Sequence, residues 1–246
     1  MEPEANTFVI SIEPKRFDGT FPAMNPHRLS DPDVAAVYRT IHSRRDIREF
    51  VPGPLAPGLL ERLLLAAHAA PSVGYMQPWR LIHVTDPDLR TSISAIVEAE
   101  RQRTATALPT RNEEFLKLKV EGLKNCAEVV VVALMHGREQ HIFGRRTMPE
   151  MDLASAACAI QNMWLAARAE GIGLGWVSIF EPAALSALLS MPTGARPIAI
   201  LCIGQVLSFP ERPVLDVLGW GQRMALERVV FKNQWPADAE PTPPAY

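Results

Sequence analysis

The chain has 246 residues, of which 48% are hydrophobic and 21% are charged, as is usual for a globular protein with a large buried core. Its formal net charge of −2 argues against a nucleic-acid partner, because nucleic-acid binding usually requires a basic surface. The sequence has neither an apolar run of the roughly 20 residues that a membrane span needs nor an N-terminal secretory signal. The three cysteines, Cys126, Cys158 and Cys202, lie in apolar contexts, so we expect reduced core thiols in a cytoplasmic protein.

The pattern along the chain predicts one main domain that contains both helices and strands. Residues 1–33 are rich in Pro, Asn and Asp and are interpreted as an N-terminal arm, residues 34–235 as the folded domain, and residues 236–246 as a flexible tail. In chain order, we expect helices over 31–41, 59–70, 86–108, 109–124, 148–170 and 183–190. We expect strands over 80–85, 127–135 and 196–206, with a further strand in the Gly-rich segment 171–180 and a terminal strand over 228–231 that pairs with its own sheet or a partner's.

The segment Ser43–Phe50 concentrates positive charge. Arg44, Arg45 and Arg48 fall within five residues, with Asp46 between them. Guanidinium groups bind phosphate oxygens through paired hydrogen bonds and stay charged at any working pH. Read as a helix, the segment places Arg44 and Arg48 on one face, where a single anion would engage both. The alternative is a helical segment with a solvated basic face.

A loop over residues 70–79 joins a predicted helix to a predicted strand. It carries Ser72, Gly74, Gln77 and Trp79. Polar and aromatic residues on a loop between regular elements are typical of binding sites, although such a loop can equally be a simple turn.

Two of the predicted helices have distinct characters. The helix over 148–170 is apolar nearly all round, so we expect it to be central and buried. Glu150 and Asp152 lie in its first turn, where the helix dipole favours carboxylates. The helix over 109–124 is charged and lies between strands, and we interpret it as a lid that excludes water from the site.

Several familiar sites are excluded by the sequence. The glycines of segment 171–175 do not form the dinucleotide fingerprint, because the position of the third glycine holds Trp176. No phosphate-binding P-loop and no nucleophile elbow occur, and the six histidines lack the spacing of a metal site, so no metal is expected. A phosphorylated cofactor would therefore need side chains, such as the clustered arginines, as its anion site.

The segment Arg44–Arg48 followed by the loop Ala70–Trp79 resembles the nitroreductase-like flavoproteins, in which a basic segment and a P-S-x-x-N-x-Q-P-W-type loop hold FMN. Within this family the chain is most similar to the 5,6-dimethylbenzimidazole synthases. That similarity rests on Asp46 inside the arginine motif, on Met148–Asp152 and on Gly175–Phe180, and the resemblance covers about residues 34–235.

The resemblance implies an α+β fold, with a mixed sheet covered by helices, in an intertwined homodimer that has two FMN sites at the subunit interface. It also implies the residues of the site. By this resemblance the flavin-binding residues are Arg44, Arg45, Asp46, Ile47, Arg48, Ser72, Gln77, Leu174, Gly175 and Trp176, with Arg223 assisting at the phosphate.

The implied reaction consumes the flavin. Reduced FMN meets O2, its ring system is fragmented, C1′ of the ribityl chain becomes C2 of dimethylbenzimidazole, and the remainder leaves as erythrose 4-phosphate. Asp46 and Ser178 match the two essential residues of that group. The flanking arginines favour the ionised form of Asp46, which suits a base. Ser178 has no base in sequence reach, so we interpret its hydroxyl as a positioning or proton-relay group.

Alternatives stay open at the level of residues and of function. Asp46 can be an ion-pair partner of Arg45 or Arg48, and Ser178 a strand-end hydroxyl bonded to backbone. The chain can also be an NAD(P)H-dependent nitroreductase or flavin reductase, or a flavin-binding module without turnover, although neither needs a carboxylate at position 46. No nicotinamide motif is visible, so NAD(P)H is expected only as an indirect electron source, through a separate flavin reductase.

Overall fold

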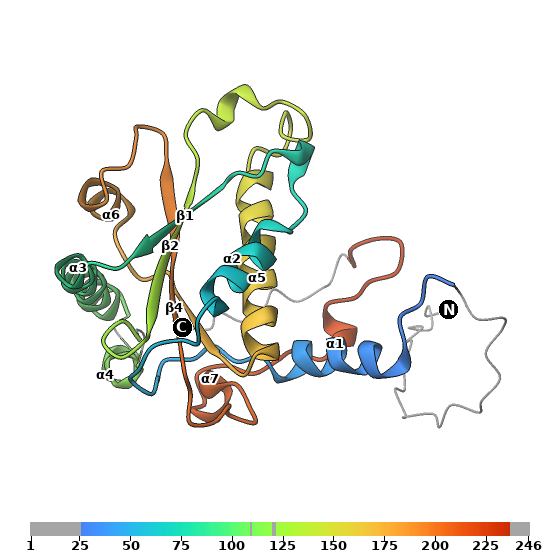
Figure 1. The fold of residues 1–246 in the computed structure, drawn as a ribbon, viewed down its shortest axis with the longest axis horizontal. Coiled ribbons are helices and arrows are strands. Elements are labelled where there is room, and N and C mark those ends of the chain that lie inside the picture. The colour runs from blue at the N-terminus through green and yellow to red at the C-terminus, as the bar shows by residue number, and fades with distance from the viewer. Residues whose placement is uncertain (1–25, 109, 120–121, 237–246) are drawn as a thin grey trace, which may run out of the picture. The chain divides into compact units, whose positions relative to one another are not determined.

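The computed structural model describes residues 26–108, 110–119 and 122–236, and it divides into two compact units (Figure 1). The larger unit comprises residues 36–213. The smaller one contains, within the described ranges, residues 26–35 and 214–236. Most of the expected arm and tail lies outside the described residues, and the domain boundaries stay a prediction.

The larger unit is built on a four-stranded sheet with the order β1-β2-β4-β3. The strands are β1 (Trp79–Val84), β2 (Glu128–Leu134), β3 (Gly173–Val177) and β4 (Arg196–Gly204), and each neighbouring pair is antiparallel. An isolated parallel bridge joins Asp46, which lies outside these strands, to Leu174 of β3. The α+β class is confirmed, and among the described residues the parallel part of the predicted mixed sheet is confined to this bridge.

Helices cover both faces of the sheet (Figure 1). Helices α2 (Leu59–His68) and α5 (Met151–Ala169) pack against one face, and α3 (Pro87–Thr106) and α6 (Pro182–Leu188) pack against the other. Successive side chains of a strand point to opposite faces. Val130 and Val132 of β2 accordingly join the core under α2 and α5, while Val129 and Val131 join the other core. The predicted burial of this strand on both faces is confirmed.

Shorter elements complete the larger unit. The charged helix expected over 109–124 is only six residues long, α4 (Asn112–Lys117), because extended backbone at Leu118 ends it. Its role as a lid stays a prediction. Two 3-10 turns, η1 (Val73–Tyr75) and η2 (Arg138–Gln140), lie in the loops that follow α2 and β2.

Helix α1 (Asp31–Ser43) begins in the smaller unit, which also contains α7 (Val214–Val217) and the 3-10 turn η3 (Leu226–Arg228). Residues 228–231 do not form a strand in the single chain, so the expected pairing with its own sheet is wrong, while pairing with a partner's sheet stays a prediction. A strand requires a hydrogen-bonded neighbour, and the described part of this unit contains no other strand. Within the described ranges, no helix combines the length and the hydropathy that a membrane span requires.

Candidate active site

The arginine segment leaves helix α1 at Ser43 and continues in extended backbone, so the predicted helical pairing of Arg44 with Arg48 is wrong. The backbone N–H of Ile47 donates to the carbonyl oxygen of Leu174 at 3.1 Å, next to the parallel bridge between Asp46 and Leu174. The segment therefore runs beside β3, an edge strand of the sheet, and satisfies part of its open backbone.

Glycines in β3 make this close approach possible. A Cβ atom on Gly175 would lie 2.1 Å from the carbonyl oxygen of Ile47, and one on Gly173 would lie 3.1 Å from Cγ2 of Ile47 and 2.4 Å from Cγ1 of Val206. These distances leave no room for a side chain. Gly175 is thus required for packing the arginine segment, in addition to the role beside the flavin that the family resemblance implies.

Asp46 and Arg48 together hold the backbone of Trp176. The Trp176 N–H donates to Oδ1 of Asp46 at 3.0 Å, and Nη2 of Arg48 donates to the Trp176 carbonyl at 2.7 Å. Arg48 Nη2 also pairs with Oδ2 of Asp46 at 2.5 Å. The carboxylate is oriented through both oxygens, yet 42% of its side chain remains exposed. The ion pair that was considered as an alternative is present, and it leaves the carboxylate accessible.

A pocket of about 430 Å³ brings together Arg44, Asp46, Trp176 and Ser178, four of the predicted residues. Ser178 follows the end of β3 and is exposed, and its hydroxyl has no hydrogen-bond partner within the described chain. The rest of the pocket is lined by residues that were not predicted: Gln161 and Trp164 of α5, and Ile198 of β4. The polar Gln161, three residues before Trp164 in a mostly apolar helix, was the available signal in the sequence.

The three arginines play different parts. The guanidinium of Arg44 stacks over the ring of Trp164, 4.3 Å from its centroid, as in a cation–π contact. Arg45 donates to the carbonyls of His42 at 2.8 Å and Arg44 at 2.7 Å, near the end of α1, and does not line the pocket. Nη1 of Arg48 is buried and lacks a hydrogen-bond partner among the described residues. Nε of Arg45 is likewise buried without a partner among the described residues, and Arg44 is the arginine of this segment that lines the pocket.

Other predicted residues lie elsewhere in the chain. The Ser72 hydroxyl accepts a hydrogen bond from the Gln77 N–H at 3.0 Å, and the Gln77 side chain lines a second pocket of about 450 Å³ beside β1. Ile47 and Leu174 are buried in the core, with 5% and 1% of their surface exposed. Arg223 is exposed in the smaller unit, so its role at a phosphate stays a prediction. Ser72, Gln77, Ile47 and Leu174 are not among the residues that line the pocket of Asp46.

The cysteines divide into two kinds. Cys126 and Cys202 are buried free thiols, and a hydrogen bond with Cys126 together with burial raises the pKa of the Cys202 thiol well above its ordinary value. Cys158 is an exposed free thiol on α5, so the prediction that it is a core residue is wrong. The apolar character of the surrounding helix misled that prediction, because one apolar face of α5 is exposed in the single chain.

Comparisons with known proteins agree with this architecture. Residues 41–205 match the family model of the Nitroreductase family. The chain is 37% identical to the 5,6-dimethylbenzimidazole synthase of Rhodospirillum rubrum, across 73% of this chain and 86% of that protein. It is 35% identical to the 5,6-dimethylbenzimidazole synthase of Rhodobacter capsulatus, across 78% of this chain and 94% of that protein. Its fold resembles iodotyrosine deiodinase bound to FMN and 3-iodo-L-tyrosine, with a TM-score of 0.63 and 20% identity over 81% of this chain and all of that one.

Proposed function

This chain belongs to the nitroreductase family, and we propose that it acts as a 5,6-dimethylbenzimidazole synthase. It uses O2 to fragment reduced FMN into dimethylbenzimidazole, the lower ligand of vitamin B12, and erythrose 4-phosphate. One observation carries the proposal: Asp46 and Ser178 line one pocket, in a chain that is 37% identical to a known synthase.

The pocket residues fit a flavin. Trp164 and Trp176 offer an aromatic wall, with ring centroids 6.3 Å apart, and Arg44 presents a cation beside it. Arg48 does not line this pocket, but its Nη1 is buried without a hydrogen-bond partner among the described residues, and FMN carries phosphate and carbonyl oxygens that can accept from it. Reduced FMN supplies the ring system that reacts with O2. The protein supplies binding, orientation and proton transfer.

Asp46 is suited to act as the base. Its two oxygens are fixed by the Trp176 N–H and by Arg48, and each carboxylate oxygen has further lone pairs toward the solvent side. The carboxylate would accept the proton from C1′ of the ribityl chain. The Ser178 hydroxyl lines the same pocket without a protein partner among the described residues, so it is available to position a reacting group or to relay a proton.

A homodimer completes the site in this proposal. Leu153 is 41% exposed, and it shares the exposed part of α5 with Cys158 and Gln161. An apolar helix face of this kind favours burial against a partner, here a second copy of the chain. Because Ser72 and Gln77 do not reach the pocket of Asp46 within one chain, we assign their flavin contacts to the site of the partner subunit.

The dimer predicts how Cys158 responds to a thiol reagent. We expect slow labelling by a maleimide in the native protein, because the partner covers α5, and fast labelling in Leu153→Asp, whose buried charges would separate the subunits. Mass spectrometry of timed samples measures both rates. The matched control is Leu207→Asp, which changes a residue 93% exposed outside α5. Equal labelling of Cys158 in the wild type and in Leu153→Asp would contradict this interface.

A single turnover tests the function. The protein is mixed with chemically reduced FMN without oxygen and then exposed to air, and the products are separated by mass. Dimethylbenzimidazole is the expected product. Recovery of oxidised FMN with peroxide alone would refute the synthase and favour an NAD(P)H-dependent nitroreductase or flavin reductase.

For the electron source in the cell, we propose a separate flavin reductase that uses NAD(P)H to reduce FMN. We also propose a cytoplasmic location, where Cys126 and Cys202 stay reduced.

A further inference from the structure

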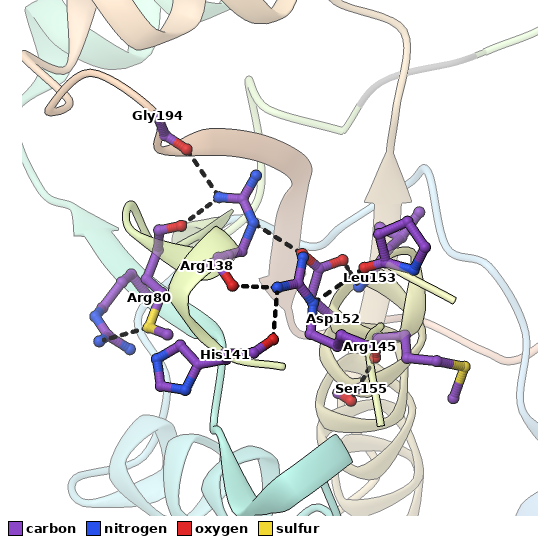
Figure 2. A network of polar contacts seen from close by, with 11 residues as sticks. Arg80, Arg138, His141, Arg145, Asp152, Leu153, Ser155 and Gly194 are labelled. Atoms are coloured by element: carbon purple, nitrogen blue, oxygen red, sulfur yellow. Dashed lines mark hydrogen bonds and ion pairs between the residues drawn. The ribbon is translucent and has the colours of Figure 1, made fainter. Parts of the chain in front are cut away.

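A second group of charged side chains lies at the start of α5, and none of its members lines the pocket of Asp46. Oδ2 of Asp152 accepts hydrogen bonds from Nε of Arg138 at 2.8 Å and from Nη2 of Arg145 at 3.0 Å (Figure 2). The Asp152 side chain is only 8% exposed, and those of Arg138 and Arg145 are 12% and 9% exposed. A buried carboxylate is costly unless it is paired in this way, so the cluster needs a structural or functional reason.

Arg138 and Arg145 stabilise the conformation of the loop over residues 136–147 through hydrogen bonds to backbone carbonyls. Nη1 of Arg138 donates to the carbonyl of Gly194 at 2.8 Å and also to that of Met135 (Figure 2). Arg145 donates to the carbonyls of Pro149 at 3.1 Å and His141 at 3.2 Å, and also to that of Arg138. Backbone carbonyl groups of this loop and of its neighbours are thus gathered around two guanidinium groups. The shape of the loop depends on Asp152, which holds both.

The folded loop packs against the loop that carries Ser72 and Gln77. A Cβ atom on Gly74 would lie 3.0 Å from the carbonyl oxygen of Phe143, and one on Gly144 would lie 2.5 Å from Cγ2 of Val73. The two loops therefore approach each other so closely that neither glycine has room for a side chain. A movement of the loop over 136–147 would release the 3-10 turn Val73–Tyr75.

Ser155, three residues after Asp152 in α5, also holds the 3-10 turn Val73–Tyr75. The Ser155 hydroxyl is buried and donates to the carbonyl of Met151 at 2.6 Å (Figure 2). The same hydroxyl accepts the N–H of Val73 at 3.0 Å. Val73 is thus fixed by Ser155 and by the loop around Gly144. Ser155 lies in the first turns of α5, and the loop around Gly144 is held at the same turns through Asp152.

We propose that Asp152, with Arg138, Arg145 and Ser155, positions the loop Ser72–Gln77 for flavin binding without touching the flavin. The inference rests on the proposed function only in assigning flavin contacts to that loop. The strained backbone of the loop makes such support necessary, because Tyr75 and Gln77 have φ values of +53° and +49°, in the left-handed region that side chains disfavour.

The test compares Ser155→Ala and Asp152→Asn with the wild type in two measurements. Hydrogen exchange followed by mass spectrometry reports the protection of the Val73 amide, and flavin fluorescence quenching reports the affinity for oxidised FMN. Loss of one hydrogen bond in Ser155→Ala is expected to speed exchange at Val73 and to weaken FMN binding by about fivefold to tenfold. The yield of a single turnover at saturating FMN should stay near that of the wild type, since the reacting groups are unchanged.

Glu170→Gln is the matched control, because it neutralises a carboxylate at the other end of α5 that pairs with Arg62 at 2.9 Å on the surface. It should alter neither exchange at Val73 nor FMN affinity. Wild-type exchange and affinity in Ser155→Ala would overturn the proposal, whether or not Asp152→Asn folds. Neither measurement requires turnover. If the wild type binds FMN but makes no dimethylbenzimidazole, the proposed synthase function is refuted. The role of Asp152 and Ser155 in FMN binding is still decided by the same two measurements.

Discussion

Asp46→Asn is expected to lower the yield of dimethylbenzimidazole in a single turnover by about 10²- to 10⁴-fold, the usual contribution of a positioned acid or base. The asparagine oxygen can still accept the Trp176 N–H, which now bonds to Asp46 at 3.0 Å, so the local backbone should hold. The variant loses the negative charge and the capacity to take a proton from C1′. Product mass after exposure to air measures the effect, and FMN affinity is measured beside it.

The control for this variant is Glu49→Gln in the same segment. Glu49 is 82% exposed and pairs with Lys119 at 3.2 Å, so its neutralisation should leave both product yield and FMN affinity at wild-type levels. If Asp46 serves only as the ion-pair partner of Arg48, Asp46→Asn and Arg48→Met would weaken FMN binding alike, and product yield at saturating FMN would persist. Near-normal yield from Asp46→Asn would remove the carboxylate from the mechanism.

The order and type of the main elements follow from local patterns in the sequence. The valine run of β2 predicted a strand buried on both faces, since a run of β-branched residues has no polar side for solvent. The Asp86 side chain caps α3 through the N–H groups of Asp88 and Leu89, with Pro87 in the first turn, a start that a sequence displays directly. Each of these patterns spans only a few consecutive residues, so it can be recognised from the sequence alone.

The conformation of the arginine segment depends on contacts that local patterns do not contain. Arg44 and Arg48 have the spacing of a helix face, yet the segment is extended because Ile47 bonds to Leu174, which lies far along the chain. Hydrogen bonding to a sheet edge outweighs a weak helical preference. Family resemblance led sequence analysis to four residues that line the pocket, Asp46 and Ser178 among them, while Gln161, Trp164 and Ile198 were missed. The arginine segment was given a helical backbone, which is wrong, and the roles of the predicted residues stay predictions.

The buried cluster of Asp152, Arg138 and Arg145 was not predicted, for a related reason. Arg138 and Arg145 lie in a polar loop, and a polar loop with scattered charges normally predicts solvent exposure. Asp152 was read as a favourable charge at a helix start, which it is, but its burial depends on the loop folding back over it. For Cys158 the error was the reverse: burial was predicted and the thiol is exposed in the single chain. An apolar helix predicts burial, but the pattern does not tell whether the covering surface belongs to the same chain.

Gly175→Ala is expected to have the largest effect on the folded structure. The new Cβ atom would lie 2.1 Å from the carbonyl oxygen of Ile47, a backbone atom that no rotamer change can move. Overpacking of this kind costs about 3 kcal/mol, which corresponds to a fall of roughly 6–12 °C in the melting temperature. Displacement of the arginine segment from β3 would also separate Asp46 and Arg48 from the backbone of Trp176, so FMN affinity should fall by at least about tenfold.

Gly221→Ala is the matched control, because a Cβ atom there meets no atom within 4 Å. Thermal unfolding followed by circular dichroism and FMN fluorescence quenching measure the two variants side by side. The control should unfold and bind like the wild type, which would assign the effect of Gly175→Ala to the contact with Ile47. If Gly175→Ala instead keeps wild-type stability and FMN affinity, the arginine segment does not lie against β3 at this distance. The orientation of Asp46 toward the pocket would then need a different support.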